Sequence, residues 1–89
     1  MKLNWKDKNA KEQLDKKLDE IVNTGSDESI DISNIVSSEF YELYDIDEVT
    51  DFNGWQCDWW SLMHYKGRIF EVCGGAWYGT IEISLSDES

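Results

Sequence analysis

The first periodic stretch of the chain begins near Asn9. From there, apolar residues recur every three or four positions with Lys and Glu between them, at Ala10, Leu14, Leu18, Ile21 and Val22. This spacing places the apolar side chains on one stripe of an α-helix. Asn9 with Glu12 three residues later matches a capping box, and Gly25 suits the left-handed stop of a helix. The pattern therefore predicts a helix that covers one face of a sheet.

A second stretch with a period near 3.6 residues covers residues 32–46. Its apolar positions are Ile32, Ile35, Val36, Phe40, Leu43 and Tyr44. They predict a helix or helical turn that ends near Tyr44 and is capped by Ser33 or Ser38. Residues 29–33 also fit a brief strand, so the start of this helix stays open. The outer side of the predicted helix carries Glu39, Glu42 and Asp45.

In the rest of the chain, apolar and polar residues alternate as they do in β-strands, and residues typical of tight turns separate these runs. Asn53-Gly54 and Lys66-Gly67 stand between such runs, and Asn and Gly accept the positive φ angles of a type I′ turn. The last run, residues 80–86, alternates apolar with polar side chains. We therefore expect three or four antiparallel strands in a meander.

Pairing about Lys66-Gly67 fixes which side chains share a face of the predicted hairpin. One face then carries Met63, Phe70 and Val72, which we assign to the core with the final strand (Ile81, Ile83, Leu85) and the first helix. The other face still carries large apolar groups, which would meet water or the second helix: Trp60, Leu62, Ile69 and Cys73. An apolar second face raises the question of what it contacts.

Length and composition fit one small domain over residues 1–89. The chain is 40% apolar and 13% aromatic, more than disordered chains of high charge usually contain. We predict an α+β fold with two helical segments packed on a three- to four-stranded antiparallel β-meander. So short a chain has a thin core, which makes a homodimer an open alternative.

Charge is distributed very unevenly along the chain. Residues 1–17 hold six lysines and three acids, whereas residues 18–65 hold twelve acids and no lysine or arginine. The net charge of −11 opposes direct binding to nucleic acid or to an anionic membrane, since both need Lys and Arg. No run of 18 apolar residues and no signal peptide is evident, so we expect a cytoplasmic protein.

Residues with catalytic or metal-binding chemistry form no recognisable constellation. His64 is the one histidine, with Glu71 as a diagonal neighbour, and no nucleophile is arranged around this pair. Cys57 and Cys73 are too few for a zinc site, and the acids of residues 45–53 lack the glycine and glutamate of a calcium loop. We therefore expect no enzyme, no cofactor and no resident metal, although loose binding of a divalent cation by these acids stays open.

Small size, strong acidity and the absence of an enzyme motif resemble the small inhibitors of phages and mobile elements, including DNA mimics and anti-CRISPR proteins. The resemblance lies in composition over the whole chain and not in a sequence motif. It implies an inhibitor that acts in a bacterial cytoplasm on a basic nucleic-acid-binding protein such as a nuclease. Other classes fit as well: an immunity protein for a toxin nuclease, a peptide-binding adaptor, or a protein that binds or sequesters a nucleotide.

The expected binding site combines carboxylates with aromatic anchors. Carboxylates speed association with a basic surface, and buried indole rings slow dissociation. The chain has five tryptophans, more than so thin a core is expected to enclose. We predict that the site consists of Glu39, Glu42, Asp45, Asp47, Glu48, Asp51, Trp55, Trp59, Trp60 and Trp77.

Overall fold

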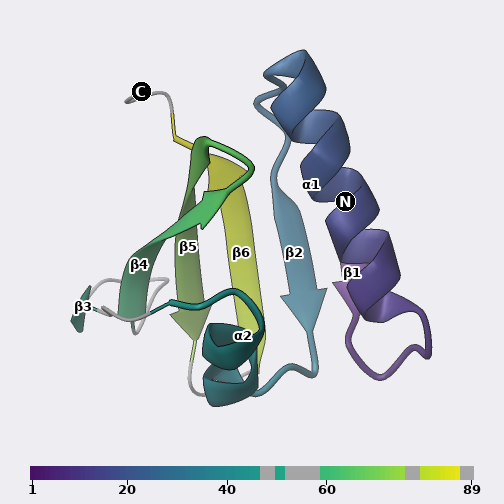
Figure 1. Ribbon diagram of the computed structural model, residues 1–89. Coiled ribbons are helices and arrows are strands. Elements are labelled where there is room, and N and C mark those ends of the chain that lie inside the picture. The colour runs from purple at the N-terminus through teal and green to yellow at the C-terminus, as the bar shows by residue number, and fades with distance from the viewer. Residues whose placement is uncertain (47–49, 52–58, 76–78, 87–89) are drawn as a thin grey trace.

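The computed structural model describes residues 1–46, 50–51, 59–75 and 79–86. It is an α+β fold in which two helices pack on a mixed sheet (Figure 1). The elements follow the order β1 (Lys2–Asn4), α1 (Ala10–Thr24), β2 (Ile30–Ser33), α2 (Ser37–Leu43), β3 (Thr50–Asp51), β4 (Trp59–Tyr65), β5 (Arg68–Gly75) and β6 (Thr80–Leu85). The strands lie side by side as β1-β2-β6-β5-β4-β3.

The sheet is larger than the predicted meander and is not wholly antiparallel. β4, β5 and β6 form the expected antiparallel meander, and the two-residue β3 adds to one edge. β2 pairs with β6, and β1 pairs with β2 in parallel, with α1 as the crossover between them. The expectation of three or four antiparallel strands is therefore only partly correct.

The second helix begins later than the helical period suggests. Residues 29–33 take the strand alternative: Ile30 and Ile32 alternate with exposed Asp31 and lie in the core. Asn34 then adopts a left-handed φ of 57°, which separates β2 from α2. Of the two alternatives for Ile32, the strand is therefore correct, because a strand buries this apolar residue through a period of two.

The first helix ends as expected but begins differently. Gly25 has a φ of 68°, and its N–H donates to the carbonyl of Ile21 at 2.8 Å. At the other end, the side chain of Asn9 makes no capping hydrogen bond, so the predicted capping box is wrong. The backbone carbonyl of Asn9 still accepts the first helical hydrogen bond, from Gln13 at 2.9 Å.

The β4–β5 hairpin has the predicted register. Tyr65 pairs with Arg68, and both turn residues take positive φ angles, 48° at Lys66 and 80° at Gly67. The Asn53-Gly54 turn lies outside the described residues, although the pairing of Asp51 with Trp59 places β3 beside β4. The register of the β4–β5 hairpin decides which side chains face the helices.

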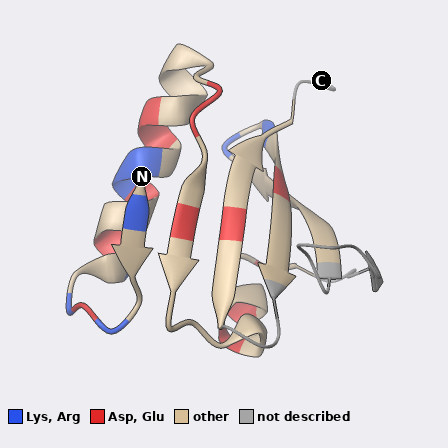
Figure 2. Cartoon of the chain, turned by 180° about the vertical axis from the view of Figure 1, so that it is seen from behind, with Lys and Arg blue, Asp and Glu red and all other residues tan. Residues whose placement is uncertain are grey.

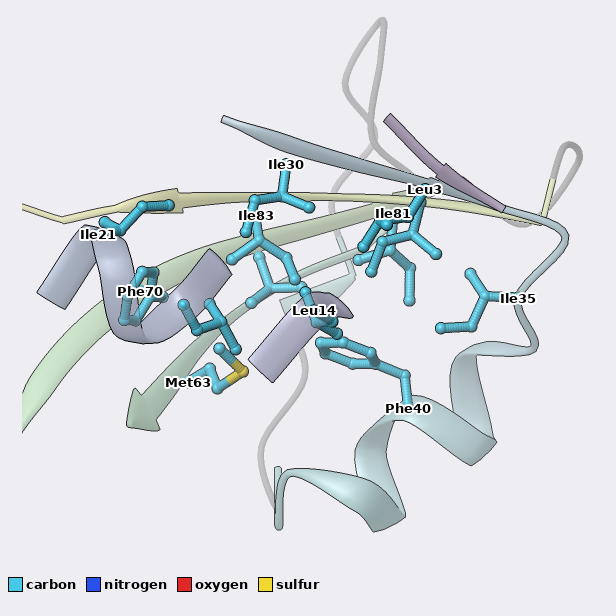
Figure 3. Close-up of a cluster of buried hydrophobic side chains, with 13 residues drawn as sticks. Leu3, Leu14, Ile21, Ile30, Ile35, Phe40, Met63, Phe70, Ile81 and Ile83 are labelled. Carbon is cyan, nitrogen blue, oxygen red and sulfur yellow. The ribbon is translucent and has the colours of Figure 1, made fainter. Parts of the chain in front are cut away.

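Both helices cover the same face of the sheet, and the core lies between them and the strands (Figure 3). Met63, Phe70 and Val72 are fully buried there, as predicted, and Leu85 packs at the margin. Phe40 is the residue of α2 that enters this core. Among the described residues, the cluster comprises Leu3, Leu14, Leu18, Ile21, Ile30, Ile32, Ile35, Phe40, Met63, Phe70, Val72, Ile81 and Ile83.

Two tyrosines close the margin of this core against α1. The hydroxyl of Tyr44 donates to Asp15 at 2.7 Å, and that of Tyr65 donates to Asp19 at 2.9 Å. Lys66 forms an ion pair with the same Asp19 at 2.6 Å. Burial, and then the hydrogen bond to Asp19, raise the pKa of Tyr65 from 10.0 to about 12.

This raised pKa predicts a loss of stability at alkaline pH. A tyrosine whose folded pKa exceeds its unfolded pKa stabilises the fold fully below the unfolded value, and this contribution is lost as pH rises through the folded value. For Tyr65 the window runs from pH 10.0 to about 12. Urea unfolding followed by circular dichroism should show a flatter pH dependence in this window for Tyr65→Phe than for the wild type. Parallel curves for the two proteins would contradict the assignment.

Candidate partner-binding face of the sheet

The second face of the sheet carries neither α1 nor α2. Figure 2, turned by 180° from Figure 1, looks onto this face and shows acidic residues on β2, β6 and β5. Because side chains alternate along a strand, each core residue has neighbours that point to this side. We call this surface the open face; its side chains are Lys2, Asn4, Asp31, Ser33, Trp60, Leu62, His64, Ile69, Glu71, Cys73, Thr80, Glu82 and Ser84.

A cross-strand pair of carboxylates marks one half of the open face. Asp31 on β2 lies directly opposite Glu82 on β6, and both side chains are exposed. Like charges directly opposite each other destabilise a sheet. Within the described part of the chain, no Lys, Arg or His forms an ion pair with either carboxylate.

The ion pairs of the described residues are formed elsewhere. Lys11 pairs with Asp15, Lys17 with Glu20 and Glu28, and Lys66 with Asp19, all along α1 and its surroundings. The hydrogen bond and charge of Lys17 lower the pKa of the Glu28 carboxyl, and the hydrogen bond from Lys66 lowers the pKa of Asp19. Acids beside the helix thus form ion pairs. Asp31 and Glu82 form none in the described residues, although Lys2 on β1 stands in register beside Asp31.

The other half of the open face is apolar. Trp60, Leu62 and Ile69 lie on β4 and β5, and Leu62 keeps 41% of its surface exposed. The indole Nε1 of Trp60 donates to Oε1 of Glu71 at 2.8 Å, which holds the ring across the strand pair. Glu71 therefore stands at the boundary between the apolar half and the acidic half.

A hollow of about 370 Å³ opens at the acidic end of this face. It is lined by Lys2, Leu3, Asp31, Ile32, Ser33, Cys73, Thr80, Ile81 and Glu82. The lining carries two carboxylates, two hydroxyl groups and the ammonium group of Lys2, so its net charge is −1, which suits a cationic group better than the phosphates of a nucleotide. The hollow therefore favours a cation over the nucleotide considered from the sequence.

The residues predicted from the sequence do not all meet on one surface. Trp60 lies on the open face, whereas Glu39 and Glu42 belong to α2 in the helical layer, with Asp45 just beyond it. All three acids are exposed, and Glu39 accepts a hydrogen bond from the indole of Trp5 at 3.4 Å. Asp47, Glu48, Trp55 and Trp77 lie outside the described residues; Asp51 and Trp59 are placed only as paired strand positions.

Sequence reasoning missed the carboxylates at the centre of the open face. A signal for them was present: Ile30-Asp31-Ile32 and Ile81-Glu82-Ile83 share one pattern, an acid between two core isoleucines. On neighbouring strands this pattern directs both acids to the same side. Glu82 also falls outside the cation-free segment on which the charge argument concentrated.

No group of three or more His, Cys, Asp or Glu side chains could hold a metal ion in the portion of the chain that the structure describes. His64 is exposed and pairs across the strands with Ile69. Neither described helix is long and apolar enough to cross a membrane.

Comparison with known protein families, curated proteins and solved structures finds no match for this chain. Function must therefore be argued from the open face itself.

Proposed function

We propose that the protein is a non-enzymatic inhibitor that docks its open face on a basic surface of a nucleic-acid-handling protein. The observation that carries the proposal is the pairing of Asp31 directly opposite Glu82, where the described residues place one cation, Lys2 on β1 beside Asp31, and no ion pair. Such a pair weakens the sheet that contains it, and a cost to stability is a frequent mark of a functional site. A cationic partner would relieve this repulsion on binding.

The two halves of the open face support two different steps of binding. With a net charge of −11, the protein attracts a basic partner over a distance, which raises the association rate at low salt. Trp60, Leu62 and Ile69 then supply apolar contact, which governs the dissociation rate. A groove that normally binds phosphates would present the Lys and Arg side chains that this arrangement requires.

Charge reversal with a matched control tests the proposal. Asp31→Lys with Glu82→Lys, and Asp27→Lys with Glu42→Lys, change the net charge equally but on different surfaces. Against a panel of purified basic nucleases and DNA-binding proteins, the open-face variant should lose roughly tenfold or more in association rate at low salt, with a weaker salt dependence. The control variant should bind nearly as the wild type does.

The same pair of variants shows what would contradict the proposal. If Asp27→Lys with Glu42→Lys abolished binding and the open-face variant bound normally, the site would lie in the helical layer, near the acids first predicted. Both variants should remain folded by circular dichroism, because all four side chains are exposed. Equal losses in both would assign the effect to net charge alone.

A further inference from the structure

The width of the open face matches an α-helix. From β2 to β4 the sheet spans three strand spacings, roughly 14 Å at about 4.8 Å each. A helix with its side chains is about 10–12 Å across. We infer that the partner element bound here is an amphipathic α-helix with Lys or Arg along one flank. This inference rests on the proposed function.

The two halves of the face are complementary to the two sides of such a helix. A helix lying along β6 and β5 would direct one flank toward Asp31 and Glu82 and the other toward the apolar half. Cations on the first flank would pair with the carboxylates. An apolar stripe would cover Trp60, Leu62 and Ile69, with Glu71 and its bonded indole between the two. The partner would thus form a third layer on a two-layer fold.

An extended peptide suits this surface less well than a helix. The face of a sheet offers side chains, because its backbone groups are already paired within the strands. An extended segment laid on it would leave its own N–H and C=O groups without partners, whereas a helix satisfies them internally. Backbone pairing is available only at the sheet edges, β1 and β3.

A second copy of the chain offers no helix that fits both halves of this face. The apolar stripe of α1 is buried, and the exposed Leu43 of α2 stands beside Glu42 and one turn from Glu39. Docking α2 of one copy on the open face of another would bring acids against acids. The lysines of residues 1–17 could supply complementary charge, but the apolar stripe of α1 is buried, so a second copy offers no apolar stripe beside them. An amphipathic helix of a different protein supplies both.

Two peptides of equal charge test the inference. The first has 18 residues of Leu, Ala and Lys, with Leu on one helical face and Lys along the flanks; the second is its scrambled form. Titrated into ¹⁵N-labelled protein, the first should bind at least about tenfold tighter and shift amides of β2, β6, β5 and β4. Glu82→Lys should weaken its binding at least about fivefold, and Glu42→Lys less than about twofold.

Other outcomes separate the inference from the proposed function. Equal affinity of the two peptides, with shifts on the open face, would overturn the helix but retain the basic partner. If neither peptide shifted the amides of the open face, both the helix and the basic partner would be overturned.

If the chemical shifts of open-face amides changed when the protein alone was diluted, the occupant would be a second copy of the chain. Nuclear Overhauser contacts from the open face to residues 52–58 or 76–78 in the free protein would make the chain itself the occupant, and either result would overturn the inference.

Discussion

Phe40→Ala is expected to lower the free energy of unfolding by about 3–5 kcal/mol, the usual loss for a large side chain removed from a core. Phe40 is fully buried, and its ring contacts Tyr44 with centroids 5.0 Å apart. It is the one fully buried residue of the seven in α2, whereas Tyr41 packs against the core only partly buried. Its loss leaves a cavity between α2 and the sheet (Figure 3).

This loss is large relative to the total free energy of unfolding of so small a domain. A chain of 89 residues has a small total stability, so a loss of this size removes a large share of it. The midpoint of thermal unfolding should fall by roughly 15 °C or more. Differential scanning calorimetry and urea unfolding would measure the change.

Leu43→Ala is the matched control for this experiment. It lies in the same helix and removes a side chain of comparable apolar character, but Leu43 is 43% exposed. Its expected cost is below about 1 kcal/mol, because little apolar surface leaves the core. Equal losses for the two variants would show that α2 is not held by Phe40.

Local patterns sufficed to predict the parts of the fold that depend on local rules. The stripe of α1 and its stop at Gly25 follow from helical spacing and from the conformational freedom of glycine. The β4–β5 register follows from Lys66-Gly67, since a two-residue turn fixes every pair behind it. The two faces of this hairpin could therefore be assigned from the sequence.

Pairing between distant segments could not be predicted in the same way. β1 has three residues with one buried side chain, Leu3, which is too short for any periodicity to appear. β2 resembled the start of a helix because Ile32 fits both periods. These strands complete the sheet and bring Asp31 beside Glu82, although the two residues are 51 positions apart in the sequence. The candidate site was missed because it depends on that long-range pairing.

Trp60→Ala is expected to weaken partner binding by roughly thirtyfold or more, the effect of removing an interface anchor worth at least about 2 kcal/mol. The change should appear in the dissociation rate and leave the association rate nearly unchanged, because the net charge is the same. Charge reversal at Asp31 and Glu82 should instead slow association and leave the dissociation rate nearly unchanged. Measuring both rates by surface plasmon resonance therefore distinguishes the apolar half of the open face from the acidic half.

Trp5→Ala provides the control for Trp60→Ala. Both indoles are partly buried, and both donate a hydrogen bond to a glutamate, Trp5 to Glu39 and Trp60 to Glu71. Only Trp60 lies on the open face, whereas Trp5 packs against the core cluster. Trp5→Ala should lower stability without speeding dissociation of the partner. If Trp5→Ala and Trp60→Ala changed dissociation equally, the anchor role of the open face would be wrong, and the shared effect would reflect a loosened fold.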